Sequence, residues 1–173
     1  MPEDDKDKDK VRVEGNSVYF FCEVSDDTVT ELCTALKRVS REHDTITLYI
    51  RSDGGDAYAG IAGMDYITRL GAHVHTHALG LVASAATFLF LAGDVRTMGP
   101  NSFILIHQLS GASWGNFQQL RDDVRNYEKL MRHMRRLYKR KTGLTGEMLD
   151  RLFTHDIALS ARKCLKYKIA ESV

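Results

Sequence analysis

Three side chains in this sequence have the chemistry of a serine nucleophile, a general base and an acidic residue that orients the base. Ser84 lies in residues 78–93, an apolar stretch in which Thr87 carries the only other hydroxyl. A hydroxyl in such surroundings meets little water, so it needs a nearby acceptor or a chemical role. The imidazole of His107 could accept its proton, and the carboxylate of Asp156 could hold that imidazole in one tautomer. The alternative interpretation of Ser84 is a small residue packed at the start of a helix.

Attack on a carbonyl also requires hydrogen-bond donors for the oxyanion, and two backbone amides suffice. Gly55 has no Cβ, so its backbone can approach a substrate closely. Ala85 falls in the first turn of a predicted helix, where amides have no intrahelical acceptor and the helix dipole is positive. Both are therefore candidate donors. The chain does not carry the G-x-S-x-G motif of α/β-hydrolases, because Val82 and Ala86 occupy the two glycine positions.

Length and composition indicate one soluble domain. The chain has 173 residues, of which 43% are hydrophobic and 27% charged, as is ordinary for a globular protein. The net charge of +1 argues against nucleic acid or a membrane as partner. Three scattered cysteines without a CxxC spacing suit a reducing compartment, which predicts a cytosol-type protein. Residues 1–10 alternate in charge and contain no signal-peptide core, which predicts a disordered arm before a single domain at 11–173.

Hydrophobic periodicity predicts alternating strands and helices, and hence parallel βαβ units of the α/β class. The carboxyl ends of parallel strands meet at one edge of a sheet, where sites gather. Gly54 and Gly55 follow one predicted strand, Ser84 follows the next, and His107 ends a third. We expect strands at 11–23 (a pair broken at 15–16), 45–50, 73–79, 95–98, 103–107 and 168–173, and helices at about 26–41, 57–70, 84–91, 116–141, 145–153 and 160–167.

Four segments resemble, in order and with similar spacing, the family of proteolytic subunits of the Clp protease, ClpP. They are YIRSDGGDAYAG (49–60), GLVASAATF (80–88), PNSFILIHQ (100–108) and DIALSA (156–161). The likeness extends from about residue 16 to residue 173. It implies the ClpP/crotonase fold, a spiral of ββα units with a protruding handle helix at about 110–141. It also implies a homo-oligomer of heptameric rings, stacked as a tetradecamer around a proteolytic chamber.

The resemblance also assigns roles to individual residues. It implies Ser84 as nucleophile, His107 as general base and Asp156 as the orienting acid, with Gly55 and Ala85 as oxyanion donors. Gly54 and the segment that begins at Gln108, Leu109 and Ser110 would lie beside the substrate peptide. The implied activity is that of a serine endopeptidase which hydrolyses peptide bonds of unfolded proteins or peptides through an acyl-enzyme, without metal or other cofactor.

An AAA+ unfoldase such as ClpX, ClpC or ClpA is the implied partner. ATP would be consumed by that partner, because this chain has no G-x-x-x-x-G-K-[ST] loop. Several positions depart from the family pattern. Asp53 and Leu109 replace prolines, and Thr47 and Arg69 replace aromatic residues of the unfoldase docking pocket. His155 replaces an arginine that links ring assembly to activity, which favours a pH-sensitive switch.

Two other classes of function stay open. The chain could be a structural ring subunit that partners an active paralogue and cleaves nothing. A crotonase-type acyl-CoA enzyme shares the fold, but such an enzyme should lack the Ser, His and Asp set. His73, His75 and His77 alternate along a predicted strand, so they share one face and are either metal ligands or residues of a solvated strand edge.

Overall fold

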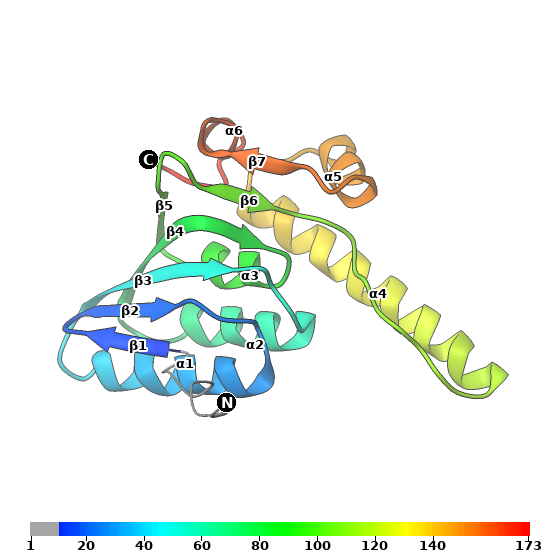
Figure 1. Cartoon of the computed structure of the whole chain (residues 1–173), viewed down its shortest axis with the longest axis horizontal. Coiled ribbons are helices and arrows are strands. Elements are labelled where there is room, and N and C mark those ends of the chain that lie inside the picture. Colours follow the sequence, from blue (N-terminus) through cyan, green and yellow to red (C-terminus); the bar gives the residue numbers. More distant parts are fainter. Residues whose placement is uncertain (1–10) are drawn as a thin grey trace, which may run out of the picture.

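The computed structural model describes residues 11–173 (Figure 1). The expected disordered arm at 1–10 lies outside the described residues. One sheet has the strand order β1-β2-β3-β4-β6-β7, and β5 also pairs with β4. The strands are β1 (Val11–Glu14), β2 (Ser17–Phe20), β3 (Thr45–Ser52), β4 (His73–Ala83), β5 (Val95–Met98), β6 (Phe103–Leu105) and β7 (Ala158–Ser160). The helices are α1 (Asp26–Val39), α2 (Ala57–Thr68), α3 (Ala86–Leu91), α4 (Phe117–Lys141), α5 (Gly146–Thr154) and α6 (Ala161–Lys166).

The long strand β4 organises the sheet. Its first half pairs with β5 and its second half with β6, both in parallel. Strands β2 and β3 are also parallel to it, whereas β1 and β7 pair antiparallel at the two edges. The predicted βαβ alternation is thus present, and the carboxyl ends of β3, β4 and β6 lie toward the same edge.

Helices α1, α2 and α3 follow one another along one side of the sheet (Figure 1). Their apolar faces and the inner face of the strands form one core, which hydrophobic burial stabilises. The sequence predicts Asp26 or Asp27 as the cap of α1, but Ser25 occupies this position, and its side chain accepts the amide of Thr28 in a capping box. The largest fully buried core side chains include Phe20, Leu32, Leu48, Ile50, Phe88 and Phe90.

The long helix α4 extends away from the body of the molecule (Figure 1). Asn116 begins it with a capping box, at the residue where the sequence predicted the helix to start. Its first half leaves apolar side chains in solvent: Phe117 is 75% exposed and Val124 56%. Trp114, in the preceding segment, is 99% exposed. Its second half packs into the core through Leu130, Met134, Leu137 and Tyr138.

Two short strands differ from the expectation. β6 ends at Leu105, two residues earlier than predicted, so that His107 lies just beyond the strand. The C-terminal segment 168–173 forms no strand, although Ser172 makes a bridge to Thr97. Instead, Ala158–Ser160 forms β7 against β6. The three residues of β7 show too little periodicity for a strand to be predicted, and β7 forms because its partner β6 is already in place.

Candidate active site

The turn that carries Ser84 joins β4 to α3 and has a rare backbone conformation. Ser84 has φ +53°, in the left-handed region that residues with a Cβ seldom adopt. Its amide donates to the carbonyl of Leu105 at 2.9 Å, which anchors the turn to β6. Such strain persists only where the surrounding structure enforces it, and it clusters at active sites. The sequence did not predict this conformation, since no glycine marks the turn.

The glycine pair after β3 packs directly against this turn. A Cβ on Gly54 would lie 2.5 Å from the Cβ of Ser84 and 2.9 Å from the carbonyl oxygen of Ala83. Gly54 also has φ +101°. Its carbonyl accepts the amide of Val24 at 2.7 Å, which ties the glycine loop to the segment after β2. Only a glycine allows this approach, so the loop and the nucleophile turn form one unit.

The two candidate oxyanion donors, Gly55 and Ala85, directly follow Gly54 and Ser84 in the chain, and their amides are unpaired in the described residues. Within residues 11–173, neither the N–H of Gly55 nor that of Ala85 donates to a protein acceptor. Ala85 caps α3, a helix of only six residues, so its value as a donor rests on the free N–H rather than on a helix dipole. A free amide beside a serine hydroxyl is the arrangement that an oxyanion requires.

Strand register brings His107 and Asp156 to the same edge. In the antiparallel β6–β7 pair, Leu105 lies opposite Ala158. Continued by two residues, this register sets His107 opposite Asp156. Ser84 is tied to Leu105 of the same strand, so all three segments meet around the end of β6. His107 is half-buried and Asp156 exposed, and in the described part of the chain no hydrogen bond joins either side chain to the other or to Ser84.

The expected substrate-binding segment runs from β6 toward α4. The amide of Leu109 donates to the Sδ of Met131 at 3.1 Å, which fastens the segment to the helix. Gln108 and Leu109 line a cavity of about 620 Å³ together with residues of α4. Ser110 is exposed. A second cavity, of about 600 Å³, is bordered by Gly54 and Gly55. Open space for a peptide therefore borders both the segment after β6 and the glycine pair after β3.

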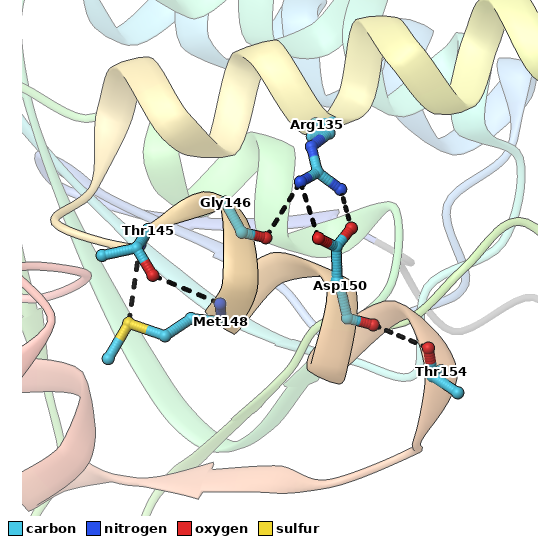
Figure 2. Close-up of polar contacts among 6 residues, drawn as sticks. All are labelled: Arg135, Thr145, Gly146, Met148, Asp150 and Thr154. Atoms are coloured by element: carbon cyan, nitrogen blue, oxygen red, sulfur yellow. Dashed lines mark hydrogen bonds and ion pairs between the residues drawn. The ribbon is translucent and has the colours of Figure 1, made fainter.

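An ion pair between α4 and α5 was not anticipated from the sequence. The two Nη atoms of Arg135 donate to the two carboxylate oxygens of Asp150, and Nη2 also donates to the carbonyl of Gly146 at 2.9 Å (Figure 2). The hydroxyl of Thr154 donates to the carbonyl of Asp150 at 2.7 Å (Figure 2). Bidentate geometry of this kind orients two elements firmly. Since α5 ends at Thr154, the pair fixes the helix that precedes Asp156.

The pair predicts a pH-dependent stability difference. Hydrogen bonds from Arg135 hold the pKa of Asp150 below its usual range. A lowered folded-state pKa gives stability that is present above the unfolded value, about 3.9, and is lost as the pH falls through the folded one. Asp150→Asn should therefore lower the Tm at pH 7, by no more than about 2 °C because the pair is exposed. The gap to the wild type should close on acidification in calorimetry; a gap that widened would contradict this account.

The three histidines of β4 do not converge on one point. His75 Nε2 and His77 Nδ1 lie 2.8 and 2.6 Å from the hydroxyl of Thr97, and His73 Nδ1 lies 3.4 Å from a carboxylate oxygen of Asp94. Burial and the neighbouring His75 lower the pKa of His77. Residues 11–173 contain no group of three or more His, Cys, Asp or Glu side chains arranged to hold a metal ion.

Comparison with known proteins decides the family. The family model described as Clp protease matches residues 8–173. This chain belongs to the Clp protease family. The match and the mixed α/β sheet confirm the predicted fold class, and they identify a serine protease subunit of the Clp type. Among residues 11–173, none of the helices combines the length and the apolar composition that a bilayer crossing demands.

Several curated relatives of this Clp-type peptidase are ATP-dependent Clp protease proteolytic subunits. The subunit of Chlorella vulgaris is 30% identical over 161 residues, which cover 90% of this chain and 80% of the relative. That of Pleurastrum terricola is 30% identical over 155 residues, covering 87% and 79%. Subunit 2 of Mycolicibacterium paratuberculosis is 29% identical over 160 residues, covering 90% and 80%.

Proposed function

We propose that Ser84, His107 and Asp156 are the catalytic triad of this Clp-type peptidase, with Gly55 and Ala85 as its oxyanion donors. The observation that carries the proposal is the Ser84 turn. A serine in the left-handed region, packed on Gly54 and followed by a free amide, combines a strained nucleophile with an anion donor. A ring subunit without catalytic function would have no use for that strain.

The chemistry follows from these positions. The Oγ of Ser84 attacks the scissile carbonyl carbon while His107 takes its proton, and Asp156 stabilises the imidazolium. The amides of Gly55 and Ala85 donate to the tetrahedral oxyanion; each such donor lowers the barrier by about 3 kcal/mol. Collapse returns the proton to the leaving amine and forms an acyl-enzyme. A water molecule, activated by His107, then attacks the acyl carbon in the same way; this step releases the second product and restores Ser84.

The triad contacts close only during catalysis. His107 lies two residues beyond β6, and Asp156 lies on the turn between α5 and β7, so both can shift without breaking the sheet. Catalytic hydrogen bonds are often long in free enzymes and shorten with substrate bound. A peptide that pairs with Gln108, Leu109 and Ser110 on one side and with Gly54 on the other would order this edge.

Assembly and partners complete the proposal. The curated relatives are named ATP-dependent Clp protease proteolytic subunits, and we propose the same dependence here. An AAA+ unfoldase such as ClpX, ClpC or ClpA would supply the ATP hydrolysis. Stacked heptameric rings of this chain would enclose the active sites, so that only unfolded proteins or short peptides enter. The reaction needs no cofactor, and a reducing compartment, the bacterial cytosol or plastid stroma, suits the chain.

Covalent labelling tests the assignment of the nucleophile. A fluorophosphonate probe reacts with activated serines, so the assembled protein should acquire one label per chain, and peptide mapping should locate it on Ser84. His107→Ala should slow labelling by at least about 1,000-fold, because the hydroxyl then keeps its proton. Label on another serine, or no label on folded, assembled protein, would overturn the proposal and favour the non-catalytic ring subunit.

A further inference from the structure

Two buried hydroxyls connect the nucleophile turn to α4. Thr87 lies three residues after Ser84, in α3, and Tyr138 lies in the packed half of α4; they are 1% and 0% exposed. The Oγ1 of Thr87 is 2.6 Å from the carbonyl oxygen of Ser84 and 2.7 Å from the hydroxyl oxygen of Tyr138. This chain of hydrogen bonds spans 51 residues of sequence and ends on the nucleophile's own backbone.

The direction of each hydrogen bond follows from counting protons. A carbonyl oxygen only accepts hydrogen bonds, so the single hydroxyl proton of Thr87 must be donated to the carbonyl oxygen of Ser84. The bond between the two hydroxyls is then donated by Tyr138. Burial raises the pKa of Tyr138, so its phenol keeps that proton across the physiological range. The ring of Tyr138 packs against Phe88 and Phe153, with centroids 5.5 and 6.1 Å away, which holds the donor in place.

The carbonyl that accepts these bonds shares a peptide group with the amide of Ala85. A trans peptide is planar, and its C=O and N–H point in opposite directions. The Ser84 oxygen accepts the Thr87 hydroxyl at 2.6 Å and also the Thr87 amide at 3.0 Å. Two hydrogen bonds to the Ser84 carbonyl oxygen fix the orientation of the Ser84–Ala85 peptide plane. The N–H of Ala85, on the opposite side of that peptide, therefore points in one defined direction. The two hydrogen bonds also polarise the peptide, which strengthens that N–H as a donor.

We propose that Thr87 and Tyr138 are positioning residues that aim the N–H of Ala85 at the substrate oxyanion. The proposal rests on the oxyanion role of Ala85 given above. Neither side chain touches the substrate: Tyr138 orders Thr87, and Thr87 orders the Ser84–Ala85 peptide. Because Tyr138 belongs to α4, the same contacts make the geometry of the oxyanion donor depend on the position of that helix.

Thr76, in β4, provides a matched control, because a buried threonine hydroxyl often bonds a backbone carbonyl for stability alone. Its side chain is also 0% exposed, and its hydroxyl donates to the carbonyl of Phe90 at 2.8 Å. It therefore has the chemistry and burial of Thr87 but bonds the other end of α3. Thr76→Val and Thr87→Val remove equivalent hydroxyls, and only the second loosens the Ala85 peptide.

The experiment compares Thr87→Val, Thr87→Ser, Tyr138→Phe and Thr76→Val as assembled particles. For each we would measure the Tm, kcat and KM on a fluorogenic peptide, and the Ki of a peptide aldehyde, whose hemiacetal places an oxyanion at the site. Thr87→Val should lower kcat and raise Ki about tenfold, less than the 100-fold or more for complete loss of a donor. KM should change less than twofold. Tyr138→Phe should show an effect of about threefold, and Thr87→Ser and Thr76→Val almost none.

Equal kcat values for Thr87→Val and Thr76→Val at matched Tm would overturn the proposal, as would a Thr87→Val effect confined to KM. Should Thr87→Val fail to fold, Tyr138→Phe tests the proposal instead, because it keeps the ring and its packing. Its kcat and its Ki for the peptide aldehyde are then the deciding measurements. Failure of the triad assignment would be distinguishable, since Ser84→Ala would then retain activity. An inactive Ser84→Ala together with an unaffected Thr87→Val would contradict the positioning role alone.

Discussion

Ser84→Ala should abolish peptide hydrolysis, lowering kcat by at least about 10,000-fold. The substitution removes the atom that would attack the scissile carbonyl, while the Gly55 and Ala85 amides remain. The variant should still bind peptides and assemble, because alanine keeps the Cβ that packs on Gly54. Alanine is also no more strained at φ +53° than serine is. Turnover of a fluorogenic peptide and native mass spectrometry of the particle measure the two effects.

Ser40→Ala is the matched control for this loss. Ser40 is the C-cap of α1, on the helical side of the sheet, and its hydroxyl donates to the carbonyl of Lys37 at 2.9 Å. Its removal should leave kcat within twofold of the wild type. Full turnover by an assembled Ser84→Ala particle would mean that another group performs the attack.

Gly54→Ala should lower activity at least about 100-fold by displacing the nucleophile. The added Cβ would lie 2.5 Å from the Cβ of Ser84 and 2.9 Å from the Ala83 carbonyl, far inside van der Waals contact. Neither neighbour is a flexible side-chain end, so the turn itself must move. A displacement of about 1 Å at a reacting group costs roughly 100-fold in rate. The kcat for a fluorogenic peptide and the rate of fluorophosphonate labelling should both fall in this variant.

Gly71→Ala separates this clash from backbone strain. Gly71 also has positive φ, +83°, but a Cβ there meets no atom within 4 Å. Both substitutions place alanine in the left-handed region, which costs about 1 kcal/mol. The control should therefore lose some stability and keep its activity. If both variants lost activity in proportion to the decrease in their Tm, the close approach of Gly54 to Ser84 would have no role in catalysis.

Long helices and the order of elements could be predicted from the sequence, since each depends on local signals. Apolar residues that recur in steps of three and four predicted a helix at about 116–141, and α4 agrees with these bounds to within one residue. Thr145 begins α5 with a capping box, as expected for a helix cap. The alternation of strands and helices was also sufficient to predict that Gly55, Ser84 and His107 lie toward one edge of the sheet.

What could not be predicted depends on contacts between distant residues. The left-handed φ of Ser84 arises because Gly54, in the loop after β3, and Leu105, at the end of β6, hold the turn. Strand β7 exists only because β6 offers it an edge. The Thr87–Tyr138 contact joins α3 to α4; the apolar stretch around Thr87 indicates that its hydroxyl needs an acceptor, but nothing in the sequence pairs it with Tyr138. Such pairings follow from the completed fold and leave no periodic pattern.

The central claim is that folding gathers a hydroxyl, an imidazole and a carboxylate beside two free amides. The most direct measurement is an experimental structure of the assembled particle after reaction with a fluorophosphonate. We predict a phosphoryl oxygen within about 3 Å of the amide nitrogens of Gly55 and Ala85, with the ring of His107 between the modified Oγ and Asp156. A phosphoryl group turned away from both amides, with His107 directed elsewhere in every subunit, would contradict the account.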